Sequence, residues 1–151
     1  FEEQISLVSG AGHPFYGRAT VDLAELDKVN FVALSPQTSA GSLIRSYLDN
    51  SGISVVPAVT TDNVETVKRM VEAGMGVAFL PDMSTSDDVA PAGGFGRLWR
   101  SAVEPTLSLP LALVTWKDSR PSSALDAFVD EVRRIGLRWD GTRGRPADPV
   151  D

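Results

Sequence analysis

The clearest hydrophobic pattern in the chain lies between residues 53 and 81, in the segment ISVVPAVTTDNVETVKRMVEAGMGVAFLP. Residues 53–59 are β-branched and apolar, which predicts a strand, and Pro57 places that strand at an edge or a bulge. Apolar side chains then recur at helical spacing from Val64 to Val71. The charged residues of this helix are predicted to face solvent: Glu65, Lys68, Arg69 and Glu72.

Both ends of that helix carry sequence signals. Thr61 or Asp62 is predicted to open it, because Asp62-x-x-Glu65 has the form of a capping box. Gly74 can take the left-handed conformation that ends a helix. Residues 77–80 are wholly apolar, which is typical of a short parallel strand buried on both faces. The segment therefore predicts a βαβ unit.

The pattern extends beyond this unit in both directions. Residues 31–34 form an apolar run that leads through a polar loop into a helix closed by Gly52, so residues 30–81 read as β-α-β-α-β. Right-handed crossovers would make their sheet parallel and layered. Further predicted elements are strands at residues 3–9, 97–100 and 107–117, helical turns at 21–26 with Leu23 and Leu26 inward, and a helix at 120–136. The predicted fold class is α/β, with a layered, mainly parallel sheet and helices on both faces.

Composition narrows the function classes. The chain has 151 residues, of which 42% are hydrophobic, and this suits one soluble globular domain with a real core. We see no apolar run long enough to cross a membrane and no signal peptide. The absence of cysteine excludes disulfides and thiolate metal sites, and it fits a reducing compartment. The net charge of −6 argues against this chain binding nucleic acid by itself.

Candidate catalytic residues are few. The only histidine, His13, precedes a proline in a glycine-rich loop, which favours a structural role over a base or a metal ligand. Gly74 and Gly76 precede a strand, whereas a phosphate-binding glycine loop precedes a helix, so we interpret them as structural. The adjacent acids Asp87 and Asp88 are more typical of a solvated loop than of a metal site. We predict no enzymatic activity, no metal and no cofactor.

Ligand binding is better supported than catalysis. Ligands of open α/β folds collect outside the carboxyl ends of the strands, where residues 35–39 (SPQTS) and 60–62 (TTD) are predicted to lie. Both loops open helices, whose unpaired N–H groups favour an anion or a carbonyl oxygen. Asp62 should repel an anion, which places any ligand carboxylate nearer Thr38 and Ser39. Helix capping alone explains these side chains equally well.

Two polar stretches show no periodicity. Residues 82–96 are predicted to form a long loop, and residues 137–151 a flexible C-terminal tail. Arg138, Arg143, Arg145 and Trp139 could contact nucleic acid, but acids in the same tail cancel much of their charge, so a solvated tail is favoured.

Several segments, taken in order, resemble one protein family. VKRMVEAGMGVAFLP resembles the most recognisable stretch of the effector-binding domain of LysR-type transcriptional regulators. Further segments similar to that domain are GHPFYGRATVDLAEL, FVALSPQTSAGSLIRSYLDNSGISVVPAVTTDNVETV and LSLPLALVTWKDSRPSSALDAFVDEVRR. The resemblance covers residues 3–135 and rests on the order of these segments rather than on a catalytic residue.

The resemblance implies a ligand-sensing piece of a bacterial, cytoplasmic transcription regulator with no membrane partner. Residues 1–115 resemble the second of two lobes related to type 2 periplasmic binding proteins, and residues 116–136 resemble the segment that returns to the mostly absent first lobe. A small, anionic effector would bind between the lobes and modulate DNA binding by a homo-oligomer. Promoter DNA would be contacted only through an N-terminal helix-turn-helix that is absent here. Carried over by position, the implied effector contacts are Gln37, Thr38, Ser39, Thr60 and Thr61.

Two alternatives stay open at this point. The chain could be one lobe of a periplasmic solute-binding protein, whose gene would encode a signal peptide. A small α/β enzyme is less favoured, because His13 would be its only conventional base. With the first lobe missing, an apolar stripe on the last predicted helix should fold back on its own sheet or self-associate; it consists of Leu125, Phe128, Val129 and Val132.

Overall fold

The computed structural model describes residues 2–27, 29–85, 97–114 and 122–136. The chain divides into two compact units, one formed by Gln4–Leu109 and the other by Phe1–Glu3 with Pro110–Asp151. The first unit holds the α/β body, and the second holds helix α4 (Ser123–Gly136). The predicted tail at residues 137–151 and the acids Asp87 and Asp88 lie outside the described residues.

Seven strands lie within the described residues. They are β1 (Glu2–Gly10), β2 (Thr20–Asp22), β3 (Phe31–Leu34), β4 (Pro57–Thr61), β5 (Ala78–Pro81), β6 (Leu98–Glu104) and β7 (Leu107–Pro110). One sheet has the order β2-β6-β1-β5, with β7 also paired to β1, and a second sheet consists of β3 and β4. A parallel bridge between Phe31 and Val77 joins β3 to the start of β5.

The α/β class is confirmed, but the sheet is mixed. β3 is parallel to β4, and β2 is parallel to β6. β1, in contrast, runs antiparallel to both β5 and β6. Hydrophobic patterning locates a strand and its buried face but carries no information on the direction of its neighbours, which is why the antiparallel strand was not predicted.

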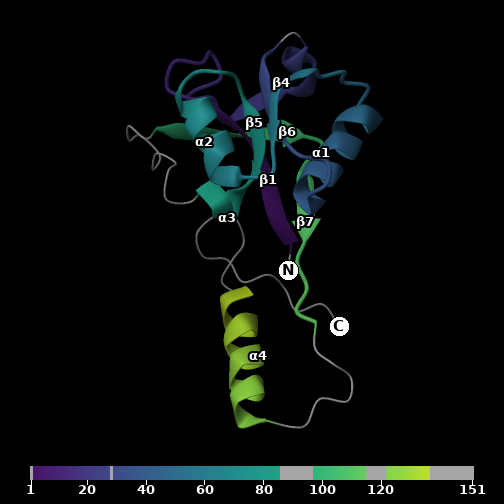
Figure 1. Cartoon of the computed structure of the whole chain (residues 1–151), viewed down its shortest axis with the longest axis vertical. Helices are drawn as coiled ribbons and strands as arrows, with labels where there is room; N and C mark the ends of the chain where they lie inside the picture. Colours follow the sequence, from purple (N-terminus) through teal and green to yellow (C-terminus); the bar gives the residue numbers. More distant parts are fainter. Residues whose placement is uncertain (1, 28, 86–96, 115–121, 137–151) are drawn as a thin grey trace. The chain divides into compact units, whose positions relative to one another are not determined.

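The predicted β-α-β-α-β order from residue 30 to residue 81 is confirmed as β3-α1-β4-α2-β5. Helices α1 (Ser39–Asn50) and α2 (Val64–Glu72) pack on opposite sides of the strands (Figure 1). This is the arrangement that right-handed crossovers require when β4 and β5 lie on opposite sides of β3.

Strand β4 begins later than its apolar sequence predicts. Residues 53–56 precede it, and Pro57 is its first residue. Closure of α1 uses the intervening chain, because Gly52 takes a φ of 71° and the Ile53 amide donates to the Leu48 carbonyl at 3.0 Å. β4 starts where the chain first pairs with β3, with Pro57 opposite Phe31.

The start of α2 is also displaced, from Thr61 or Asp62 to Asn63. The Asn63 side chain caps the helix by accepting a hydrogen bond from the Thr66 amide at 3.0 Å. Thr61 is still part of β4, and its hydroxyl accepts from the Asn63 amide at 3.2 Å. Three consecutive residues can cap here, and the strand's length decides among them. Gly74 ends the helix region with a φ of 77°, as predicted.

The core lies where the two helices cover β3 and β5. Val67 and Val71 of α2 are fully buried, and Phe79 of β5 stacks on Phe31 of β3 with ring centroids 6.1 Å apart. Every residue of Ala78–Leu80 is buried, which confirms a strand covered on both faces. Leu23 and Leu26 are buried as predicted, although residues 20–22 form strand β2 and only Leu23–Leu26 forms a helix, of the 3-10 type (η1).

The remaining elements agree with the pattern, with adjusted bounds. β6 lies in the predicted strand region that begins at residue 97, and α4 begins at Ser123. The strand predicted over residues 107–117 is wrong in its extent, because β7 ends at Pro110, which has no N–H to donate, and residues 111–114 are not strand. A single helical turn, α3 (Asp82–Thr85), opens the segment predicted as a loop from residue 82. Within the described ranges no helix is both long and apolar enough to span a bilayer.

Candidate ligand-binding site

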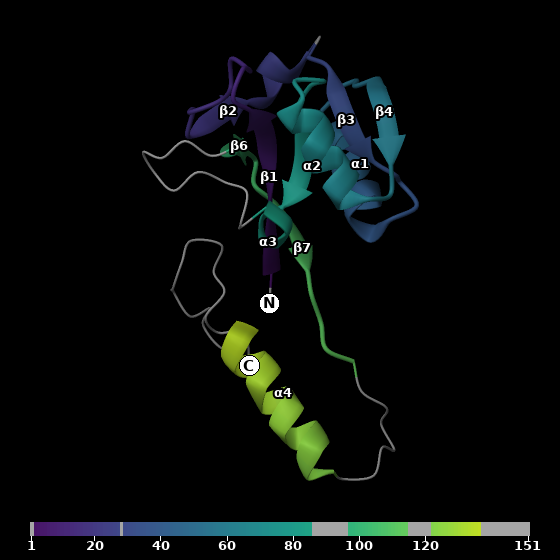
Figure 2. The ribbon, with the colours of Figure 1, turned by 60° about the vertical axis from the view of Figure 1, so that its left-hand side comes forward.

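The carboxyl ends of β3, β4 and β5 open onto one edge of the sheet, because these strands are mutually parallel. The rim denotes here the segments at that edge: residues 35–39, 60–63 and 81–85. Figure 2 shows β3 and β4 side by side. The Ser35 amide donates to the Thr61 carbonyl at 2.8 Å, so the first two segments of the rim are in direct contact.

Thr38 holds the first rim segment in shape. Its hydroxyl accepts from the Gly41 amide at 3.0 Å and donates to the Ser35 carbonyl at 2.8 Å. Ser35 in turn accepts from the Gln37 amide through its hydroxyl at 3.3 Å. Thr38 is therefore the cap of α1, and its hydroxyl proton is already committed.

The two helix starts at the rim differ in charge. The first turn of α1 carries no acidic residue, whereas that of α2 carries Glu65. First-turn amides of a helix lack intrahelical acceptors and favour negative charge. The α1 start is accordingly the better place for an anionic group, as the sequence suggested.

The five predicted contact residues fall into two groups. Thr38 and Thr61 are partly buried and use their hydroxyls to cap local backbone. Gln37, Ser39 and Thr60 are exposed. Capping therefore accounts for Thr38 and Thr61, whereas the side chains of Gln37, Ser39 and Thr60 are open to solvent.

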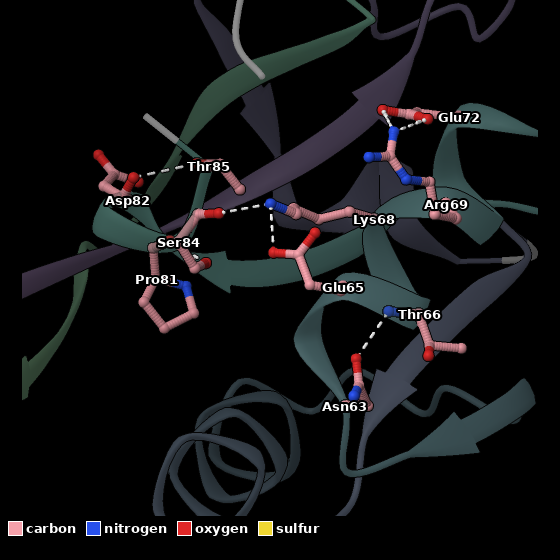
Figure 3. Close-up of polar contacts among 10 residues, drawn as sticks. All are labelled: Asn63, Glu65, Thr66, Lys68, Arg69, Glu72, Pro81, Asp82, Ser84 and Thr85. Atoms are coloured by element: carbon pink, nitrogen blue, oxygen red, sulfur yellow. Dashed lines mark hydrogen bonds and ion pairs between the residues drawn. The ribbon is translucent and has the colours of Figure 1, made fainter. Parts of the chain in front are cut away.

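A polar cluster at the third segment was missed by sequence reasoning (Figure 3). Lys68 was predicted to face solvent, but it is only 5% exposed. Its Nζ donates to the Ser84 carbonyl at 3.0 Å and lies 2.6 Å from a carboxylate oxygen of Glu65. The apolar stem of lysine tolerates burial when the amine finds partners. The Ser84 carbonyl becomes visible as a partner of Lys68 only once α3 is placed. Helical periodicity carries no information about it.

Asp82 adds a buried acid to the same segment. It is 7% exposed and lies 3.2 Å from Arg100. Burial raises the pKa of its carboxyl, although a hydrogen bond from Ser6 and the charge of Arg100 act in the opposite direction. Its Oδ1 atom is buried without a hydrogen-bond partner. A further negative group would be disfavoured beside it, which again directs an anion to α1.

His13 lies at the opposite end of the sheet from the rim. β1 pairs Ile5 with Pro81 at the rim end, and His13 follows the other end of β1, Gly10. The His13 Nδ1 accepts from the Phe15 amide at 3.2 Å, and its ring packs edge-on against Phe15. Burial lowers the pKa of His13. These contacts support the structural interpretation. Among the described residues no group of three or more acids or histidines is arranged to hold a metal ion.

Comparison with known proteins identifies the family. The family model of the LysR substrate binding domain matches residues 1–136. The chain belongs to the LysR substrate-binding domain family. This membership favours the regulator over the periplasmic binding protein and the small enzyme, and it agrees with the prediction that the chain is not an enzyme.

Relatives of the chain are transcription regulators. It is 30% identical over 135 residues to the uncharacterized HTH-type transcriptional regulator YwqM of Bacillus subtilis, covering 88% of this chain and 44% of that protein. It is 26% identical over 149 residues to a probable RuBisCO transcriptional regulator of Emiliania huxleyi, covering 96% of this chain and 46% of the relative. The chain thus spans about half the length of the curated relatives it matches.

Two solved regulatory or effector-binding domains share the fold. The regulatory domain of CcmR from Synechocystis PCC6803, in complex with 2-PG, superposes with a TM-score of 0.72 at 12% identity, over 89% of this chain and 64% of that one. The effector-binding domain of QuiR in complex with shikimate gives a TM-score of 0.65 at 18% identity, over 89% of this chain and 62% of that one.

Proposed function

We propose that this chain is the ligand-sensing lobe of a cytoplasmic LysR-type transcription regulator, and that it binds a small anionic effector at the rim. The observation that carries the proposal is the contact between the Ser35 amide and the Thr61 carbonyl, which joins the two loops beside an acid-free helix start. The side-chain contacts we assign to the effector are Gln37, Ser39 and Thr60. Thr38 and Thr61, the other two residues of the predicted set, would hold the two loops in place beside them. The complexes of related folds with 2-PG and with shikimate support a small ligand of this kind.

The whole protein would act on DNA. We propose that promoter DNA is bound through a helix-turn-helix outside this chain, as the names of the relatives suggest. Residues 1–115 would form the second regulatory lobe, and residues 116–136 would belong mainly to the first. A complete cleft would then need both lobes, so we expect the isolated chain to bind effectors weakly.

Shikimate, a carboxylate, and 2-PG are suitable probes of the rim. We expect titration of the chain with either compound to shift the backbone amide NMR signals of residues 37–41 and 60–63. Ser39→Ala should weaken binding about fivefold, because it removes one exposed hydroxyl that can bond to the anion. Ser46→Ala is the matched control, since Ser46 is an exposed serine on the same helix, away from the rim. Equal affinities for the two variants, or shifts confined to other segments, would contradict the site.

Helix α4 carries the surface that we assign to self-association. Phe128 is 57% exposed on its apolar stripe, with Leu125, Val129 and Val132 partly exposed beside it. Because a stripe of this kind favours burial against another apolar surface, we expect sedimentation to show concentration-dependent oligomers. Phe128→Glu should weaken them at least tenfold, whereas Ala127→Glu, on the opposite face of the helix, should not. A monomer at all concentrations, with fast amide exchange through residues 124–135, would contradict the assignment.

A further inference from the structure

A second concavity lies inside the α/β body, between α1 and the β3–β4 pair. Its volume is about 190 Å³, and most of its lining is apolar. The lining comes from both layers and includes Val32 and Leu34 of β3, Ile44 and Leu48 of α1, and Val55 before β4. It also includes Pro36 and Thr60, so the pocket extends from the interior toward the rim.

The pocket is large enough for one ring. Apolar protein cavities of about 150 Å³ stay dry and bind benzene. Four residues that line this pocket on the side of α1 are at most 9% exposed (Phe31, Ile44, Leu48 and Phe79), so its walls belong to the packed core and are already formed. A ring that enters gains burial of its surface without ordering the protein.

One cationic side chain lines the same pocket. Arg45 belongs to the middle of α1, and its side chain is 61% exposed. Its Nε donates to Asp49 at 3.0 Å, which is an exposed ion pair of small net energy. A guanidinium has further N–H donors in a planar fork that fits a carboxylate. The pocket therefore combines an apolar interior with a carboxylate-binding group at the solvent side.

We propose that this pocket is a binding site for a small aryl carboxylate, with the ring between α1 and β3 and the carboxylate on Arg45. This site adjoins the rim, with which it shares Pro36 and Thr60, but it places the ligand ring in the interior beneath α1. An occupant would contact the helix that begins at Thr38, and it would thus be placed to alter the shape of the first rim segment.

Three probes test the parts of this proposal separately. Phenylacetate carries both the ring and the carboxylate, toluene carries the ring alone, and acetate carries the carboxylate alone. We expect phenylacetate to shift the amide NMR signals of residues 32–34 and 44–48 in the full chain, toluene to shift the same signals more weakly, and acetate to leave them unchanged. Ala33→Leu, which fills the pocket from β3, should weaken phenylacetate and toluene binding at least tenfold.

Arg45→Gln provides a second test that leaves the packed core untouched. It should weaken phenylacetate binding about tenfold and leave toluene binding unchanged. Arg69→Gln is the matched control, because Arg69 is an exposed helical arginine paired with Glu72 at 2.8 Å. Identical phenylacetate affinities for these two variants overturn the proposal, as does the absence of shifts at residues 32–34 and 44–48 with millimolar phenylacetate. If Ser39→Ala weakens phenylacetate and Arg45→Gln does not, the ligand sits at the rim, and the pocket assignment fails while the rim proposal stands.

Discussion

Gly41→Ala is expected to lower the free energy of unfolding by about 2 kcal/mol and to disturb the first rim segment. A Cβ atom at position 41 would lie 2.0 Å from the Ser35 carbonyl oxygen, a backbone atom that cannot move without shifting the loop. Overpacking of this kind costs up to about 3 kcal/mol. Alanine returns about 1 kcal/mol through its higher helix propensity, so the clash outweighs the gain.

Urea denaturation monitored by circular dichroism measures this loss, and amide NMR spectra locate it. Gly12→Ala is the control, since a Cβ atom there meets nothing within 4 Å. Its free energy of unfolding should stay within about 0.5 kcal/mol of that of the parent. A Gly41→Ala protein with an unchanged midpoint and unchanged signals for residues 35–41 would show that α1 does not rest on Ser35 as described.

Lys68→Met is expected to destabilise the protein by about 2 kcal/mol. Methionine keeps the apolar stem but leaves the Ser84 carbonyl without the charged donor that now lies 3.0 Å away. Hydrogen bonds to charged groups are worth about 1.5–3 kcal/mol. Glu65 adds little to the loss, because its side chain is 65% exposed and regains water.

A neighbouring ion pair on the same helix isolates the effect of burial. Arg69 pairs with Glu72 at the same i,i+3 spacing, but the Arg69 side chain is 54% exposed, so Arg69→Met should cost less than about 1 kcal/mol. Denaturation midpoints compare the two variants, and amide exchange of residues 82–85 should accelerate only in Lys68→Met. Equal losses would mean that the burial of Lys68 has no energetic role.

Much of the α/β body could be predicted from local sequence, because the signals for each helix or strand lie within that element or next to it. Gly52 and Gly74 mark turns after helices, and both adopt a positive φ. The apolar residues of Ala78–Leu80 indicate a doubly covered strand, which the structure confirms. These features depend on backbone conformation and burial, which neighbouring residues largely determine.

Features set by distant residues could not be predicted. Lys68 is buried only because the chain after β5 returns beneath α2, sixteen residues later. The antiparallel direction of β1 depends on pairing with β5 and β6, and neither partner is visible in its own sequence. At the rim, the residue types of the loops were sufficient to suggest a shared edge. The exact start of α2 decided that Asn63, and not Thr61 or Asp62, caps that helix.

The parallel arrangement of β3, β4 and β5 gives the α/β body an electrical polarity. Both long helices of the body direct their amino-terminal ends to the same edge, and each end is equivalent to about half a positive charge. That local potential is screened within about 8 Å at physiological ionic strength, whereas the net charge of −6 belongs to the whole chain. A bulky polyanion would therefore meet net repulsion from the surface, while a compact anion that reaches the acid-free start of α1 would meet attraction. Molecular size, and not charge alone, thus enters the discrimination between solutes.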